Sequence, residues 1–169
     1  RKAPLGIDDF RPDPVSLALV QTTDMENLGS MLRSAAAFGI KQILIDDKSV
    51  DPFSRRAMRV SMGAALGMRF LALPDPEQDL RLLGSRGVVS LAATLAPDSL
   101  SVAEFSASDD PVLIVMGNEA DGLPLELQTA STQRVRIPMG CTTNRNSMVD
   151  SLNVSVAAAI LMHELTQRS

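Results

Sequence analysis

Short, almost wholly apolar segments alternate along this chain with longer segments of helical periodicity. The clearest are VLIVM at residues 112–116 and VSLALVQ at residues 15–21. A strand with few polar residues on either side has to be buried on both faces, which is typical of parallel sheets covered by helices. We therefore expect an α/β fold, with a mostly parallel sheet and helices on both of its faces.

The same alternation predicts the other elements. Further strands are expected at 43–45, 70–73, 88–93 and 134–137, and helices at 27–38, 53–66, 77–85, shortly after Gly122, and at 151–165. Residues 97–111 are expected to form a polar connection. Asn27 is a candidate N-cap of the first helix, and Gly39 is a natural residue to end it. Ligands of such sheets bind beyond the carboxyl ends of the strands. The loops in that place are 22–27, 94–97, 117–122 and 138–151.

The composition excludes several classes of protein. Hydrophobic residues make up 45% of the 169 positions, which argues against disorder and allows one domain with a sizeable core. A net charge of −4 and the absence of Trp and Tyr argue against a chain that coats nucleic acid or stacks bases on a broad aromatic surface. No apolar run reaches the roughly 18 residues of a membrane span. With one cysteine, Cys141, and one histidine, His163, we expect neither an internal disulfide nor zinc, and a reducing compartment such as the cytoplasm.

Three segments carry polar residues that suggest a site. In NLGSMLRSAAAFG, Gly29 lies one turn before Arg33, either as a packing glycine or because something approaches the backbone closely. VMGNEADGL lacks the pattern of a phosphate loop, and the acidic Glu119 better suits hydroxyls, an amine or an arginine. Arg55, Arg56 and Arg59 form a basic ridge that is either solvated or in contact with phosphate. His163 is expected to be a surface or rim residue.

The third segment, SLNVSVAAAILMHEL at 151–165, leaves no polar face after its first turn. Such a helix is buried, either in a core or between subunits. Its first turn nevertheless holds Ser151, Asn153 and Ser155. Three hydrogen-bonding side chains exceed what capping of one helix end requires, so we expect some of them to serve a site.

Together and in this order, these segments resemble the SpoU-type (TrmH-like) RNA 2′-O-methyltransferases of the SPOUT superfamily. The match lies in NLGSMLRSAAAFG, VMGNEADGL, and IPM with SLNVSVAAAI, and RVSMGAALG is also similar to the family. It covers roughly residues 15–165 and implies a sheet whose C-terminal part forms a trefoil knot. Two features depart from the family pattern: Ala120 replaces a usual glycine, and 12 residues separate Pro138 from Ser151, about twice the usual spacing.

The resemblance implies methyl transfer from S-adenosylmethionine to a ribose 2′-hydroxyl of tRNA or rRNA, by a homodimer, without a metal and away from membranes. It assigns catalytic roles to Arg33, Asn27, Glu119, Ser151 and Asn153. It assigns the cofactor to Gly117, Ile137, Leu152, Thr94 and Met139, largely through backbone groups, which would explain the glycine at 117. A guanidinium alone is a poor base, so the substrate phosphate is expected to help Arg33 act on the hydroxyl.

We expect Arg33, Arg55 and Arg59 to contact RNA. Residues 1–14 are expected to be an N-terminal extension or the remnant of a linker, and residues 15–169 the catalytic domain. Because the chain begins at Arg1 and not at methionine, an N-terminal RNA-binding domain is expected to be missing from it. Two alternatives stay open, a non-catalytic RNA-binding or dimerisation module with the same fold, and a base-methylating SPOUT enzyme.

Overall fold

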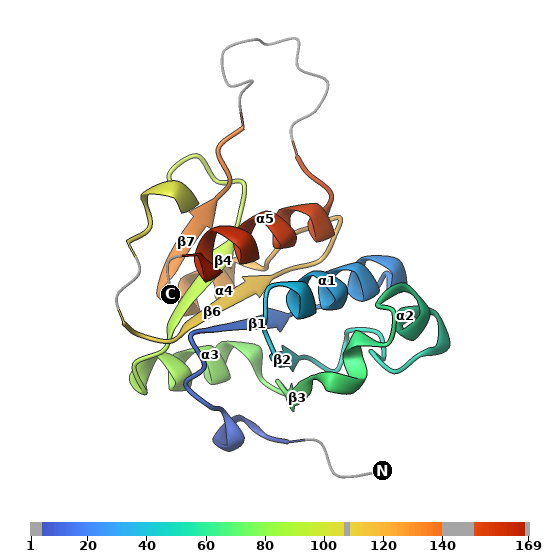
Figure 1. Ribbon diagram of the computed structural model, residues 1–169. Coiled ribbons are helices and arrows are strands. Elements are labelled where there is room, and N and C mark those ends of the chain that lie inside the picture. The colour runs from blue at the N-terminus through green and yellow to red at the C-terminus, as the bar shows by residue number, and fades with distance from the viewer. Residues whose placement is uncertain (1–4, 107–108, 140–150, 168–169) are drawn as a thin grey trace.

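The computed structural model describes residues 5–106, 109–139 and 151–167. Within them, one sheet of seven strands has the order β3-β2-β1-β6-β4-β7-β5, and all strand pairs are parallel (Figure 1). The strands are β1 (Val15–Leu19), β2 (Gln42–Ile45), β3 (Arg69–Ala72), β4 (Val89–Ala93), β5 (Leu100–Ser101), β6 (Val112–Met116) and β7 (Gln133–Arg136). The α-helices are α1 (Met25–Ala37), α2 (Arg55–Val60), α3 (Pro76–Ser85), α4 (Leu125–Ala130) and α5 (Val154–Thr166), with short 3-10 turns η1 (Ile7–Asp9), η2 (Ala64–Gly67) and η3 (Val102–Glu104).

Alternate residues of the central strands point into two cores on opposite faces of the sheet. Leu17 and Leu19 of β1 belong to the core that α1, α2 and α5 cover, whereas Ala18 belongs to the core under α3 and α4. β6 alternates in the same way, with Ile114 in the first core and Leu113 in the second. Figure 1 shows α1 beside α2 and α5. The predicted α/β fold with helices on both faces is confirmed.

The sheet has a topological switch point between β1 and β6, which lie side by side. After β1 the chain enters α1 on one face, and after β6 it enters α4 on the other. In open α/β sheets, such a point opens a crevice beyond the carboxyl ends of the two strands. The loops after β1 and β6 are therefore placed to meet a ligand.

The first helix begins two residues earlier than predicted. The Asp24 carboxylate accepts hydrogen bonds from the backbone N–H groups of Glu26 and Asn27, each at 2.8 Å, so Asp24 is the N-cap. The prediction that Asn27 caps this helix is wrong, which leaves the Asn27 side chain available for another contact. The predicted end is confirmed, because Gly39 follows the helix with a left-handed φ of 78°.

Two other predicted segments differ in the structure. The helix predicted over 53–66 is broken into α2 and η2, because Met62 and Gly63 both have left-handed backbones, with φ of 56° and 77°. The connection predicted over 97–111 contains β5, which pairs with β7 at the sheet edge. A strand of two residues is too short for hydrophobic periodicity to reveal.

Residues 5–14 pack against the sheet ahead of β1. Leu5 pairs with Leu71 of β3, which extends the sheet edge. The fully buried Gln42 amide holds the segment in place, because it accepts from the N–H of Arg11 at 3.0 Å and donates to the Arg11 carbonyl at 2.9 Å. The division of the chain at residue 14 stays a prediction.

The last helix, α5, buries only one side within this chain. The buried residues of α5 are Ala158, Leu161, Met162 and Leu165, whereas Val156 on the other side is 48% exposed.

The trefoil knot stays a prediction, because residues 140–150, which include Cys141 and the longer loop, lie outside the described residues. Among the helices that the structure describes, none is long and apolar enough to cross a membrane.

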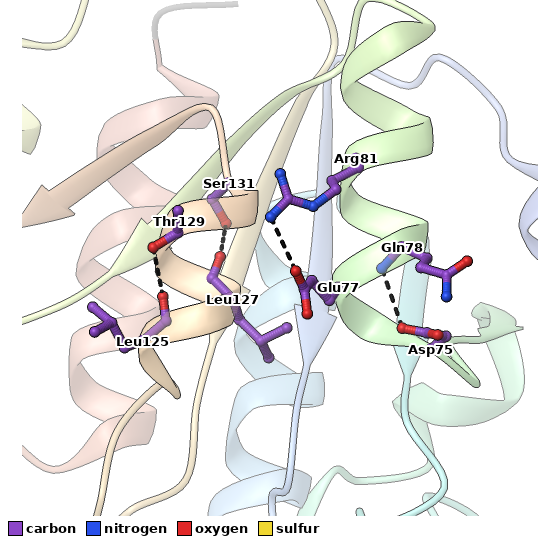
Figure 2. Close-up of polar contacts among 8 residues, drawn as sticks. All are labelled: Asp75, Glu77, Gln78, Arg81, Leu125, Leu127, Thr129 and Ser131. Atoms are coloured by element: carbon purple, nitrogen blue, oxygen red, sulfur yellow. Dashed lines mark hydrogen bonds and ion pairs between the residues drawn. The ribbon is translucent and has the colours of Figure 1, made fainter.

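On the opposite face, α3 packs beside α4 (Figure 2). The N-cap Asp75 accepts from the N–H of Gln78 at 3.2 Å, and Glu77 forms an ion pair with Arg81 at 3.0 Å. Asp79 in the first turn is only 8% exposed, and its Oδ2 accepts from the N–H of Asp75 at 3.2 Å. Burial raises the pKa of the Asp79 carboxyl, more than this hydrogen bond lowers it.

We expect Asp79→Asn to gain stability relative to the parent protein as the pH rises. The folded-state pKa of Asp79 lies above the unfolded value, so the folded chain binds more protons between the two values and stability falls as pH rises through that interval. Asparagine keeps an acceptor for the Asp75 N–H and does not ionise. The difference in free energy of unfolding between variant and parent, from urea denaturation, should grow as the pH rises above about 3.9 and level off above the folded-state pKa. A constant difference would contradict this prediction.

Candidate active site

A cavity of about 330 Å³ lies beyond the carboxyl ends of three neighbouring strands, β6, β4 and β7. Small-molecule sites usually measure about 300–1,000 Å³, so this cavity is large enough for a ligand. All five residues predicted to bind the cofactor line it, namely Gly117, Ile137, Leu152, Thr94 and Met139. Three loops far apart in the sequence therefore meet at one place.

The five predicted catalytic residues divide into two groups. Glu119 and Ser151 line the cavity. Asn27, Arg33 and Asn153 do not line it. Asn27 lies in the first turn of α1 and Asn153 at the N-terminal end of α5, two residues after Ser151, whereas Arg33 lies further along α1. The structure thus brings two of the predicted residues into one cavity, joins Asn27 to Asn153 outside its lining, and leaves Arg33 on α1 without a hydrogen bond or ion pair to the other four in the described part of the chain.

The loop after β6, residues 117–123, is closed by its own backbone. Asn118 and Gly122 form an antiparallel bridge with N···O distances of 3.1 and 3.0 Å. The Oδ1 atom of Asn118 accepts from the N–H of Ala120 at 2.8 Å, so the loop folds around the Asn118 side chain. Gly122 has a φ of 69°, a conformation that favours glycine.

Gly117 at the start of this loop has no room for a side chain. A Cβ atom there would lie 2.4 Å from the carbonyl carbon of Gly122 and 2.5 Å from the backbone nitrogen of Leu123. The glycine is therefore required by the close return of the loop's own backbone. The structure thus supplies a reason for this glycine within the loop itself, and the role of Gly117 in cofactor binding stays a prediction.

Glu119 on the same loop contacts the junction between β1 and α1. Its Oε2 accepts a long hydrogen bond of 3.5 Å from Oγ1 of Thr23. Its Oε1 is buried and has no hydrogen-bond partner among the described residues. A buried carboxylate oxygen without a donor is costly, so this oxygen is suited to a donor group that a ligand brings.

Asn27 and Asn153 meet although 126 positions separate them in the sequence. The Nδ2 of Asn153 donates to Oδ1 of Asn27 at 3.1 Å, which joins the first turns of α1 and α5. Asn153 is also the N-cap of α5, and its Oδ1 accepts from the N–H of Ser155 at 2.8 Å and from the Ser155 hydroxyl at 2.6 Å. Capping therefore accounts for Asn153 and Ser155, and Ser151 is left at the cavity.

Arg33 lies on α1 beyond this pair. Its side chain is exposed and makes no hydrogen bond or ion pair with any other residue that the structure describes. The packing interpretation of Gly29 is confirmed, because a Cβ there would lie 2.7 Å from the Cβ of Val60 on α2. The close approach comes from a neighbouring helix and not from a ligand. The role of Arg33 toward a substrate stays a prediction.

The basic ridge on α2 divides in the structure. Arg56 forms an ion pair with Glu26 of α1, both largely exposed. Arg55 and Arg59 are exposed and have no ion-pair partner in the described ranges. These two remain available for phosphate contact.

His163 is exposed, as predicted for a surface or rim residue, with its ring 5.7 Å from that of Phe38.

Sequence reasoning missed three residues that shape the site: Asn118, Gln21 and Asp46. Asn118 donates from Nδ2 to the Gln21 carbonyl at 2.8 Å, and Asp46 accepts from the Gln21 N–H at 3.0 Å. The signal for Asn118 was its place directly before Glu119. No local pattern indicates Gln21 or Asp46, because their contacts depend on which strands are neighbours.

Within the described residues, no cluster of three metal-ligating side chains occurs.

Comparison with known proteins supports a shared ancestry for this arrangement. The family model described as the SpoU rRNA Methylase family matches residues 14–163. An uncharacterised tRNA/rRNA methyltransferase of Mycobacterium tuberculosis is 36% identical over 146 residues, which are 85% of this chain and 49% of that protein. The 23S rRNA (guanosine-2′-O-)-methyltransferase RlmB of Acinetobacter baylyi is 32% identical over 149 residues, 88% of this chain and 57% of that protein.

A solved structure agrees with the fold. The AdoMet-bound rRNA methyltransferase of Sinorhizobium meliloti superposes with a TM-score of 0.83 at 28% identity, over 98% of this chain and 61% of that one. The chain spans about half the length of the M. tuberculosis relative. The similarity therefore concerns one part of these longer proteins.

Proposed function

Because the chain belongs to the SpoU rRNA methylase family, we propose that it transfers the methyl group of S-adenosylmethionine to a ribose 2′-hydroxyl of tRNA or rRNA. The observation that carries this proposal is the cavity beyond β6, β4 and β7, in which two family motifs, VMGNEADGL and IPM with SLNVSVAAAI, meet the loop that follows β4. The RlmB relative is named for guanosine 2′-O-methylation, which favours ribose as the acceptor. A base-methylating activity is the rival that the product analysis below distinguishes.

The cavity fits S-adenosylmethionine in size and chemistry. Apolar side chains such as Met116, Ile137 and Leu161 line part of it. Glu119 and Arg136 line it too, so groups of both charge signs are present for a ligand with an ammonium and a carboxylate. The buried, unpartnered Oε1 of Glu119 suits a donor on such a ligand. When bound, the cofactor supplies a methyl group on a positively charged sulfur.

The chain's own residues have to position and activate the acceptor hydroxyl. We assign Arg33 to the ribose and its phosphate, because its guanidinium is exposed and unpaired within the described chain and a planar fork of donors grips phosphate in two places. Holding both groups would restrict the directions from which the hydroxyl oxygen can approach a methyl donor in the cavity, and alignment of reacting groups lowers a barrier substantially. As the oxygen attacks, its proton would pass to an oxygen of the phosphate that Arg33 holds, because the protonated guanidinium has no lone pair to accept it.

Asn27 and Asn153 are assigned to orienting the ribose. The hydrogen bond of 3.1 Å from Asn153 Nδ2 to Asn27 Oδ1 holds the two side-chain amides together. The capping contact at Asn153 Oδ1 fixes the rotamer of Asn153. Ser151 and Glu119 line the cavity in which the methyl donor is proposed to bind, and are assigned to orienting the reacting groups. Arg55 and Arg59 are assigned to RNA phosphates further from the reacting ribose, because a net charge of −4 leaves attraction to RNA to local basic groups.

Methyl transfer and cofactor binding test the proposal together. The purified chain, with a metal chelator present, should bind S-adenosylhomocysteine saturably in a calorimetric titration. Incubation with labelled S-adenosylmethionine and undermethylated cellular RNA should yield 2′-O-methylated nucleosides after nuclease digestion. Label on a base instead of the ribose would favour the base-methylating alternative. Cofactor binding without any transfer, also after an N-terminal RNA-binding domain of a relative is fused to the chain, would favour the non-catalytic module.

We further propose that the protein is a homodimer that pairs through α1 and α5. A groove between these helices is lined by Ser30, Ser34, Ser155, Val156, Ala159, Ile160 and His163. Val156 is 48% exposed there, and the exposed side of α5 has few polar groups for contact with water. Sedimentation at micromolar concentration should give about twice the monomer mass of 18.1 kDa.

A charge at this groove should separate the subunits. We expect Val156→Glu to shift the protein to the monomer, because an unpaired carboxylate buried in an apolar interface is strongly disfavoured. The matched control is Leu125→Glu, which adds the same charge at an exposed leucine on α4 on the opposite face of the sheet and should stay dimeric. If Val156→Glu sediments as a dimer, this groove is not the interface.

A further inference from the structure

Gln21, two residues after the end of β1, has a backbone conformation that side-chain-bearing residues rarely adopt. Its φ is 53°, in the left-handed region, and the residue follows β1 at the switch point with β6. A single residue held there costs on the order of 1–2 kcal/mol, so neighbouring contacts have to maintain it. The conformation turns the chain from the sheet toward the first turn of α1, which carries Asn27.

Contacts on both sides hold Gln21 in this conformation. Its N–H donates to the buried Asp46 carboxylate, with 3.0 Å to Oδ1 and 3.1 Å to Oδ2. Its carbonyl accepts from Nδ2 of Asn118 at 2.8 Å. Asp46 lies beyond β2 and Asn118 beyond β6, so the strands on either side of β1 each supply one contact.

The Asn118 side chain uses its two ends for two different loops. Nδ2 reaches across to Gln21, while Oδ1 accepts from Ala120 N–H at 2.8 Å within the loop that carries Glu119. The Asn118 backbone closes the same loop through Gly122. One amide group thus connects the cavity loop with the segment that leads to Asn27 and Arg33.

We propose that Asn118 is a positioning residue that locks the β1–α1 junction to the cavity loop. This inference rests on the proposed function, in which the acceptor ribose lies by α1 and the methyl donor lies in the cavity. In-line transfer needs the reacting atoms held at about 3–3.5 Å, and a shift of about 1 Å can lower the rate about 10²-fold. By bonding to Gln21 and to Ala120, Asn118 holds the start of α1, where the ribose is proposed to lie, at a fixed position relative to the cavity loop.

Asn118→Asp removes only one of the two functions of the side chain. The carboxylate still accepts from the Ala120 N–H, but it has no donor for the Gln21 carbonyl and repels that oxygen. We expect kcat for methyl transfer to fall on the order of tenfold to hundredfold. The Kd for S-adenosylhomocysteine should change by less than about threefold, because the fold of the cavity loop is kept.

The matched control is Gln21→Glu, the same change from amide to carboxylate at the other end of this contact. The Gln21 side chain makes no hydrogen bond within the described residues. The contacts of Gln21 with Asp46 and Asn118 both use its backbone atoms, which the substitution keeps. We therefore expect kcat within about twofold of the parent protein. A loss in Gln21→Glu as large as in Asn118→Asp would mean that added charge, and not the broken contact, lowers the rate, which would overturn the proposal.

Amide hydrogen exchange tests the lock without any activity. A peptide covering residues 20–27 should exchange faster in Asn118→Asp than in the parent protein, and at the parent rate in Gln21→Glu. If the parent protein transfers no methyl group to RNA, the proposed function fails, and the exchange result still decides whether the lock exists. Unchanged exchange in Asn118→Asp, or a loss of kcat matched by an equal loss of S-adenosylhomocysteine affinity, overturns the positioning role.

Discussion

Replacing Arg33 with alanine should lower kcat for RNA methylation by at least about 10²-fold. Arg33 is exposed on α1 and does not line the cavity, so the affinity for S-adenosylhomocysteine should stay within about twofold. The loss follows from removing the group that is assigned to the ribose hydroxyl and its phosphate. Single-turnover transfer of labelled methyl groups, paired with calorimetric titration, measures both quantities. Near-normal transfer by Arg33→Ala would refute the catalytic assignment.

Two sets of variants separate the chemistry of Arg33 from its charge. Arg33→Lys keeps the charge, but we expect it to remain severely impaired, because an ammonium cannot reproduce the bidentate fork. Arg55→Ala and Arg59→Ala each remove an exposed arginine from the neighbouring helix α2. They should weaken RNA binding and flatten its salt dependence while sparing kcat at saturating RNA. A loss of kcat at saturating RNA in these controls equal to that of Arg33→Ala would contradict the assignment of the chemical step to Arg33 and of RNA binding to Arg55 and Arg59.

Gly117→Ala should lower the free energy of unfolding more than the same substitution at Gly84 or Gly122. The added Cβ would lie 2.4–2.5 Å from the backbone of Gly122 and Leu123, and backbone atoms cannot swing aside as the end of a side chain can. Overpacking of this kind typically costs about 1–3 kcal/mol, and we expect the upper part of that range. Since the displaced loop lines the cavity, affinity for S-adenosylhomocysteine should also fall. Urea denaturation and calorimetric titration measure the two effects.

Two other glycines give controls with the same chemical change. Gly84 lies within α3, and nothing lies within 4 Å of a Cβ there, so Gly84→Ala should stabilise the protein by about 0.5–1 kcal/mol. Gly122 has equally open space but a φ of 69°, so Gly122→Ala should cost about 1–2 kcal/mol from backbone strain alone. If Gly117→Ala is no worse than Gly122→Ala, the clash with the returning loop is not the reason for the glycine.

The elements of the fold could be predicted where burial leaves a local pattern. Val112–Met116 is apolar throughout because β6 is central and covered on both faces, so its predicted bounds agree with the structure. The pattern is weaker at the sheet edge, where two-residue β5 was missed. Helix ends were less predictable, because Asp24 and Asn27 are both good capping residues and only the backbone path selects Asp24.

The family motifs in the sequence led to the right loops but not to the contacts between them. All five predicted cofactor residues line one cavity, although their roles stay predictions. The reason for Gly117 could not be predicted, because it depends on how closely the backbone of Gly122 returns. Likewise, the sequence marks Gly29 as unusual within a helix, and only packing against Val60 shows which neighbour requires it.

By itself, the sequence determined the alternating strands and helices, the two covered faces of the sheet and the loops that carry the family motifs, because each depends on residues close together along the chain. Only the tertiary structure decided which of those loops touch. Asn153 meets Asn27 across 126 positions, and Asn118 meets Gln21 across 97. Both contacts exist because β1 lies beside β6 and α1 packs on α5. Hydrophobic periodicity does not encode the order of the strands, so it cannot predict a hydrogen bond that depends on that order.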